Sequence, residues 1–121
     1  MTNAETLYYR YGSRITSGVS LLLYDRVLED PQLQGYFAHM GDLENMRQHF
    51  SDMMCMVTGG PNIYHGRDLR EAHRNLNISN ADYDRLLEHL HACLVRVGTT
   101  VDEAQAVVEL IDTLRDQVVS A

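Results

Sequence analysis

Two of the six histidines in this 121-residue chain occupy positions from which they could carry out chemistry. The apolar spacing of residues 42–58 predicts a helix, and at about 100° per residue His49 falls on its apolar face. Residues 67–76 predict a second helix of two turns, in which His73 shares the i, i+3, i+4, i+7 spacing of the apolar residues. Two imidazoles on separate helices are therefore expected to point into the interior.

An inward imidazole needs a partner for each ring nitrogen, because a buried polar group left unpaired costs about 1–3 kcal/mol. A backbone carbonyl or a buried hydroxyl such as that of Tyr24 would be a purely structural partner. The alternative is iron, because an apolar slot with imidazole on one or both sides is what heme iron requires. Both interpretations stay open at this point. The chain does supply a lining rich in Met and Phe for such a slot, in Phe37, Met46, Phe50, Met53 and Met54.

The other histidines and the two cysteines indicate no second site. His89 and His91 are two residues apart on a predicted helix, so they point to different sides, cannot chelate one metal together and are expected at the surface. Cys55 and Cys93 lie in apolar-periodic segments without metal-ligand spacing and are expected to be reduced, buried thiols. No Ser/His/Asp arrangement, zinc helix, phosphate loop or dinucleotide fingerprint occurs, which argues against a hydrolase or a nucleotide-dependent enzyme.

Length and composition indicate one acidic globular domain spanning residues 1–121. The formal net charge is −7 and all ten basic residues are arginine, a balance that repels nucleic acid and anionic membranes. No apolar run approaches the roughly 20 residues of a membrane span, and the N-terminus lacks the apolar stretch of a signal peptide. We therefore expect a cytoplasmic monomer with no nucleic-acid or membrane partner.

Helical periodicity runs through the chain and no run of strict alternation marks a strand, so the expected fold class is all-α. Helices are predicted over 4–11, 17–29, 31–35, 42–58 and 67–76, followed by two long helices with capping boxes at Ser79 and Thr100. The predicted core stripe of the second helix is Leu21, Tyr24 and Leu28, and that of the last helix is Val101, Ala104, Val108, Ile111, Leu114 and Val118.

Three stretches of the chain resemble the truncated hemoglobins, most closely their group I members, over about residues 7–118. They are the helical segment LLLYDRVLEDPQLQGYF, the segment GGPNIYHGRDLREAH with its specific REAH end, and the helix pair from Ser79 onward. The resemblance implies the 2-on-2 globin fold, a two-over-two helical sandwich that encloses heme b (iron protoporphyrin IX). It places the proximal iron ligand on His73 and the phenylalanine that wedges the heme on Phe37, with Tyr64 and Leu69 in the lining.

Relatives with a covalent histidine-to-heme link carry that histidine in the last helix, and no histidine follows His91 here, so non-covalent heme is expected. The resemblance puts Tyr24 where the family's tyrosine hydroxyl faces bound O2, which makes it the candidate catalytic residue. A phenol there can donate a hydrogen bond to the ligand and slow its release. Met46 and Phe50 stand where many relatives carry Gln, so the usual polar network is largely absent. Met54 replaces a phenylalanine that gates a gas tunnel in some members.

His49 matches the position that supplies an internal sixth iron ligand in some cyanobacterial and algal members. We therefore expect bis-histidyl, hexacoordinate heme with His73 and His49 on its two sides; the alternative turns His49 toward the heme propionates or solvent. An internal ligand bound ~99% of the time would leave ~1% of the sites open and weaken the apparent affinity for outside ligands about 100-fold, or ~2.7 kcal/mol.

The resemblance implies a protein that binds O2, NO and CO and carries out nitric oxide dioxygenase-type chemistry, with an unidentified reductase as partner. Such chemistry would protect against nitrosative or oxidative stress. A non-enzymatic electron carrier or gas sensor is the alternative function. A helical interaction domain that never binds heme is the third possibility.

Overall fold

The computed structural model describes residues 4–38, 42–61, 73 and 76–119, and every regular element in these residues is helical, as expected. In chain order the elements are η1 (Ala4–Thr6), α1 (Leu7–Tyr11), η2 (Gly12–Arg14), α2 (Ser17–Glu29), α3 (Gln34–Ala38), α4 (Leu43–Val57), α6 (Asn80–Arg96), α7 (Val101–Asp112) and α8 (Arg115–Val118).

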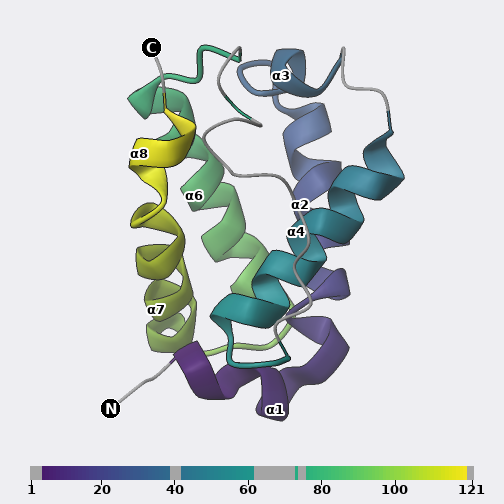
Figure 1. The fold of residues 1–121 in the computed structure, drawn as a ribbon, viewed down its shortest axis with the longest axis vertical. Coiled ribbons are helices and arrows are strands. Elements are labelled where there is room, and N and C mark those ends of the chain that lie inside the picture. The colour runs from purple at the N-terminus through teal and green to yellow at the C-terminus, as the bar shows by residue number, and fades with distance from the viewer. Residues whose placement is uncertain (1–3, 39–41, 62–72, 74–75, 120–121) are drawn as a thin grey trace.

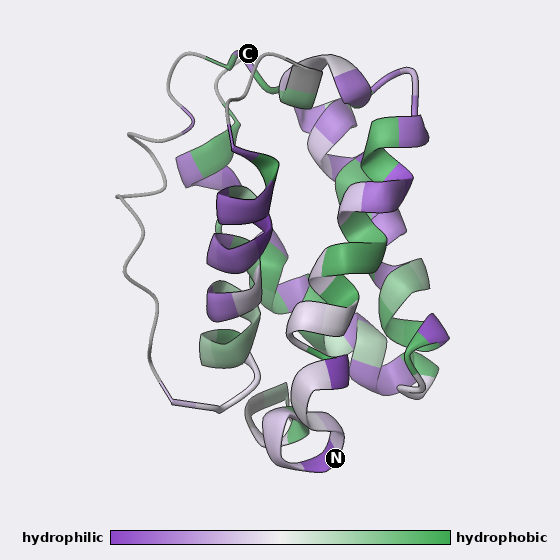
Figure 2. Ribbon diagram, turned by 90° about the vertical axis from the view of Figure 1, so that its right-hand side faces the viewer, coloured by the Kyte–Doolittle hydropathy of each residue, from purple (hydrophilic) through white to green (hydrophobic). Residues whose placement is uncertain are grey.

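Two helix pairs form the body of the molecule. The helix α2 packs against both α4 and α6, and α6 packs in turn against α7 (Figure 1). Hydrophobic residues concentrate on the helix sides that face one another (Figure 2). The center of the core consists of side chains that are almost fully buried, including Val19, Val27, Met54, Leu90, Leu94, Ala104 and Val107.

The predicted start and stop signals hold for the three long helices that follow residue 41. Asp42 caps α4 by accepting a hydrogen bond from the Asn45 amide at 3.1 Å. Ser79 caps α6 in the same way. Thr100 and Glu103 form a complete capping box on α7. After α6 the chain reverses at Gly98, whose φ of +113° is accessible at low cost only without a Cβ.

One residue in each of two predicted core stripes is exposed, whereas Tyr24, Ala104, Ile111 and Val118 of the same stripes are buried as predicted. Leu21 is 53% exposed and Val101 62% exposed, while Val19 and Val107 are fully buried. The reason is that neighboring helices decide which residues of a helix are buried. The helix α2 packs against both α4 and α6, so its buried residues are those that face these two helices. The last helix also ends at Asp112 and continues as the separate α8.

The predicted one-turn helix over 31–35 is displaced toward the C-terminus. Asp30 is responsible, because its backbone carbonyl accepts from the Leu33 and Gln34 amides and its carboxylate accepts from the Gln32 amide. These bonds form a tight turn, and α3 begins only at Gln34.

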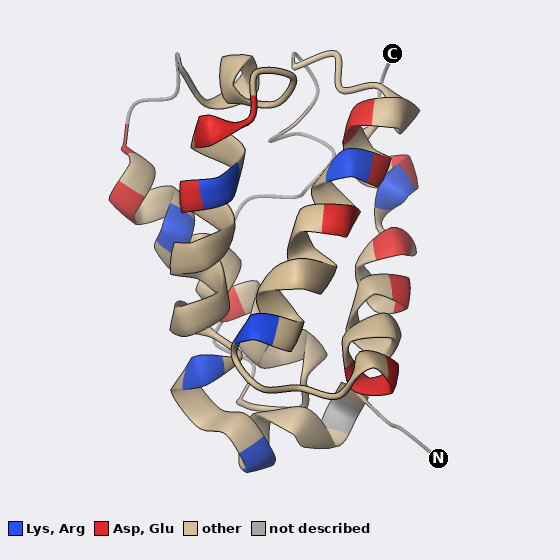
Figure 3. Ribbon diagram, turned by 180° about the vertical axis from the view of Figure 1, so that it is seen from behind, with Lys and Arg blue, Asp and Glu red and all other residues tan. Residues whose placement is uncertain are grey.

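A buried carboxylate fixes the N-terminal helix to α7. Glu103 is 3% exposed, receives a hydrogen bond from the Tyr11 hydroxyl at 2.5 Å and pairs with Arg10. Burial by itself raises the pKa of Glu103, but the hydrogen bonds from Tyr11 and the Thr100 amide outweigh it and the pKa is lowered. Acidic residues recur along α7 (Figure 3), and Glu103 is the one drawn inward.

A second buried carboxylate ties the end of α2 to α6. The Asp30 side chain is 2% exposed, and its Oδ2 accepts from Arg85 Nε at 2.5 Å and lies 2.6 Å from His89 Nε2. The Arg26 Nε donates to His89 Nδ1 at 3.0 Å, so the ring proton resides on Nε2 and is donated to Asp30. His89, whose side chain is 15% exposed, is thus a partly buried bridge, which corrects the expectation that it lies at the surface. Hydrogen bonds from Arg85 and then His89 hold the pKa of Asp30 far below its ordinary value.

This junction predicts an acid-dependent loss of stability. Because the folded-state pKa of Asp30 lies below the ordinary value of 3.8, its carboxylate stabilizes the fold above that value and loses this effect as the pH falls through the lowered pKa. The variant Asp30→Asn should be destabilized at neutral pH, and the gap to wild type in unfolding free energy should shrink from about pH 5 toward pH 2. Urea unfolding followed by circular dichroism measures the gap, with exposed Asp25→Asn as the matched control; a gap that does not change with pH contradicts the assignment.

Candidate functional site

Three aromatic side chains from different elements meet on the side of α2 that faces α4. Tyr24 on α2 is 8% exposed, and its ring lies 5.5 Å from that of Phe37 on α3 and 6.4 Å from that of Phe50 on α4, measured between centroids. Both contacts are edge-to-face, which is a favorable geometry for aromatic pairs. The structure therefore brings together three residues that the sequence predicted to share one pocket.

The Tyr24 hydroxyl is the chemically distinctive group of this cluster. Within the described part of the chain it has no hydrogen-bond partner, whereas the buried Tyr83 hydroxyl donates to the Ile111 carbonyl at 2.6 Å. Burial raises the pKa of Tyr24 to about 12, and the positive charge of Arg47 opposes this shift only in part. The phenol consequently keeps its proton at physiological pH and can donate a hydrogen bond to a bound molecule.

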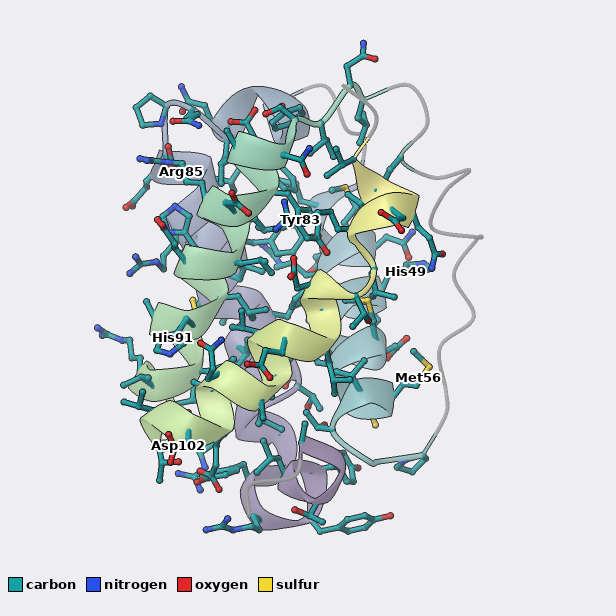
Figure 4. The ribbon with its side chains drawn as sticks, turned by 90° about the vertical axis from the view of Figure 1, so that its left-hand side faces the viewer. His49, Met56, Tyr83, Arg85, His91 and Asp102 are labelled. Carbon is teal, nitrogen blue, oxygen red and sulfur yellow. The ribbon has the colours of Figure 1, made fainter. Side chains whose placement is uncertain are left out.

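The helix α4 presents two faces of different burial to its surroundings. One face is buried in the core and carries Ser51, Met54, Cys55 and Thr58. The adjacent apolar face, with Met46, His49, Phe50 and Val57, is only half-buried. Met53 lies between the two faces and is 7% exposed. Figure 4 shows His49 and the exposed Met56 on α4, with His49 above Met56 in this view.

His73 is half-buried and helical, and its carbonyl accepts a hydrogen bond from the Leu76 amide at 3.1 Å. The predicted lining residues Tyr64 and Leu69, and most of the predicted helix 67–76, lie outside the described residues. The chain leaves this region at Asn77, whose φ of +54° is tolerated by asparagine better than by most residues.

The donor set of this region fits a heme better than a hard metal ion. Beside the aromatic cluster, α4 offers the His49 imidazole and an apolar half-buried face, and α2 offers the Tyr24 hydroxyl, which has no partner in the described chain. No group of three or more His, Cys, Asp and Glu that could hold a metal ion occurs among the residues described. In the same residues, no helix is long and apolar enough to cross a bilayer.

Sequence reasoning missed two residues beside this cluster. Ser20 is 1% exposed and its hydroxyl donates to the Arg47 carbonyl at 2.7 Å, joining α2 to α4. The available signal was the position of Ser20 one helical turn before Tyr24, on the same side of α2. A serine one turn from Tyr24 is compatible with a close crossing of two helices, but its position does not identify Arg47 as its hydrogen-bond partner.

Comparison with known proteins agrees with this geometry. The chain matches the bacterial-like globin family over residues 6–120. It is 31% identical over 113 residues to a group 1 truncated hemoglobin of Tetrahymena pyriformis, a match covering 90% of this chain and 93% of that protein. It is 33% identical over 105 residues to the group 1 truncated hemoglobin GlbN of Synechocystis, with 81% and 82% covered.

The structural comparison gives the same answer. The crystal structure of the T. pyriformis truncated hemoglobin in its Fe(III) form superposes with a TM-score of 0.88 at 27% identity, covering 96% of this chain and 99% of that chain. The predicted all-helical fold and the group I resemblance are thereby confirmed. The chain belongs to the bacterial-like globin family and, within it, to the group 1 truncated hemoglobins, which are heme-binding globins.

Proposed function

We propose that this globin binds O2, NO and CO at a hexacoordinate heme and carries out nitric oxide dioxygenase-type chemistry. The observation that carries the proposal is the hydroxyl of Tyr24, a residue only 8% exposed, which lacks a hydrogen-bond partner in the described chain. The Tyr24 ring is flanked by Phe37 and Phe50, beside the half-buried face that bears His49. This combination offers one hydrogen-bond donor and one internal ligand in otherwise apolar surroundings.

In this proposal the imidazoles of His73 and His49 would both hold the iron of a non-covalently bound heme b. The residues that would line the porphyrin in this proposal are Phe37, Met46, Phe50, Met53, Met54, Tyr64 and Leu69. The heme, when bound, supplies the metal center at which diatomic molecules bind and which changes oxidation state. The apolar residues exclude water from that center, which limits its uncontrolled oxidation.

Tyr24 acts in this proposal as the hydrogen-bond donor to a bound diatomic ligand. A pKa of about 12 keeps its phenol protonated under all physiological conditions, so donation does not depend on pH there. Met46 and Phe50 offer no N–H or O–H donor from their side chains. Among Tyr24, Met46 and Phe50, it is therefore the Tyr24 hydroxyl that discriminates between ligands of different partial negative charge.

Internal ligation by His49 favors reaction over storage. A ligand that must displace an imidazole binds with reduced apparent affinity, which disfavors oxygen storage and favors strong ligands such as NO. The overall reaction combines one O2, one NO and one electron to give one nitrate. The electron comes from a reductase, since the proposal assigns no electron donor to the chain itself.

The sixth-ligand role of His49 is tested by the variant His49→Leu. It should convert a six-coordinate absorption spectrum into a five-coordinate or water-bound one, and it should speed CO binding, because no internal ligand then competes. His91→Ala, which removes a half-buried histidine of α6, is the control and should leave the spectrum unchanged. An unaltered spectrum in His49→Leu would eliminate the internal ligand.

The donor role of Tyr24 is tested in the His49→Leu background, where ligand release is not masked by internal ligation. Tyr24→Phe there should raise the O2 dissociation rate about tenfold or more, because a charge-assisted hydrogen bond contributes about 1.5–3 kcal/mol. The CO dissociation rate, which depends less on a donor, serves as the internal control in stopped-flow measurements. Equal O2 release with and without the hydroxyl would remove Tyr24 from the ligand site.

The second candidate function is that of an electron carrier, which half-buried His49 also favors because a bis-histidyl iron changes little in coordination between oxidation states. Nitrate formation separates the two functions. The heme-loaded protein, supplied with an electron donor and O2, should produce about one nitrate per NO consumed over many cycles. Reduction and reoxidation without catalytic nitrate production would favor the carrier, and a chain that stays colorless on titration with hemin would contradict both.

A further inference from the structure

The hydrogen bond between Ser20 and Arg47 is a direct polar link between α2 and α4. The Ser20 hydroxyl is almost completely buried and donates to the Arg47 backbone carbonyl at 2.7 Å. A helical carbonyl has two lone pairs and uses one for its own helix, so Arg47 can accept this second bond without disrupting α4. The link therefore fixes a point of the α4 backbone, whatever the Arg47 side chain does.

The linked point lies within the turn of α4 that carries the candidate site residues. Arg47 directly follows Met46 and precedes His49 by two positions and Phe50 by three. On the other helix Ser20 lies one turn before Tyr24, whose ring meets that of Phe50 at 6.4 Å. Two adjacent contacts, one polar and one aromatic, thus hold this turn of α4 in register with α2.

Packing around the link is otherwise incomplete. A groove runs between the first turns of α4 and α2, and Ser20 and Arg47 lie in its wall with exposed Leu21, Asp42 and Asn45. The side chains that line this groove are mostly polar, so little apolar contact joins the first turns of α4 and α2 there. A single hydrogen bond has more influence on helix position where few other contacts fix it.

We propose that Ser20 is a positioning residue that holds α4 where His49 has a high effective concentration at the iron. This inference rests on the proposed internal ligation. It states that Ser20, which would touch neither the iron nor the ligand, influences how strongly His49 binds. Preorganization of a helix that bears an internal ligand raises the fraction of time for which the ligand is bound, because less freedom remains to be lost on binding. Loss of the link should therefore make His49 easier to displace.

The test is a double-mutant cycle in the heme-loaded protein, with CO binding after flash photolysis and the ferrous spectrum as readouts. Ser20→Ala should speed CO binding about 2- to 10-fold and raise the five-coordinate fraction, the range expected for one hydrogen bond. In the His49→Leu background the same change should have no effect on the rate, because there is no internal ligand to displace. If Ser20→Ala instead loosened the whole fold, it would change the CO binding rate equally in the wild-type and His49→Leu backgrounds.

Three further variants complete the test. Ser20→Thr keeps the hydroxyl and should restore the slow rate, while Ser20→Cys, a weaker donor of similar size, should give a smaller change than Ser20→Ala in the same direction. Ser17→Ala is the matched control, since in the described part of the chain the Ser17 hydroxyl bonds within its own segment, to the Ser13 carbonyl at 3.3 Å. If His49→Leu speeds CO binding and Ser20→Ala does not, this inference alone is wrong. If His49→Leu changes nothing, internal ligation and this inference both fail.

Discussion

The contact between α2 and α4 is the constraint on which the candidate site depends. Tyr24 is on one helix, and Met46, His49 and Phe50 are on the other, so no pocket exists until the two helices are in register. Because α2 is also packed against α6, it is the fixed member of the pair and α4 is placed relative to it. The Tyr24–Phe50 ring contact and the Ser20–Arg47 hydrogen bond define that placement.

The scaffold behind the site is held by different forces from the site itself. Asp30 joins the end of α2 to α6 and Glu103 joins α1 to α7, each through bonds from an arginine and from neutral donors. Buried carboxylates with several donors are costly to disrupt, because breaking one bond leaves a charge without compensation. On the site side, α4 is instead joined to α2 by the Tyr24–Phe50 ring contact and the neutral Ser20–Arg47 hydrogen bond, which cost less to disrupt than a buried charge.

This division bears on the proposed chemistry. A protein that must let an internal imidazole yield to an outside ligand needs one helix that can adjust and a surrounding frame that does not. In the proposed function α4 is that helix, and the α2–α6–α7 body is the frame. In the same proposal Met46 and Phe50 are apolar, so the Tyr24 hydroxyl would donate to the ligand and His49 would compete with it.

The amino-acid sequence by itself determined the local structure and the family. Periodicity and capping residues predicted the bounds of α2, α4 and the start of α6 and α7 almost to the residue, because caps such as Asp42, Ser79 and Thr100 act through bonds to their own helix. The segment containing REAH indicated the globin resemblance that the comparisons confirm. The resemblance also grouped Tyr24, Phe37 and Phe50 in one proposed site, and their rings are in contact in the structure.

Only the tertiary structure decided which side of each helix is buried and which polar groups are paired across elements. Leu21 and Val101 belong to regular apolar patterns yet lie exposed, because burial depends on how many neighbors surround a helix rather than on its own periodicity. Asp30 and Glu103 are charged residues in the interior, and His89 is a bridge rather than a surface residue, because their partners lie 55 to 93 positions away in the chain. The Ser20–Arg47 bond spans 27 positions, and no local rule relates those residues before the two helices cross.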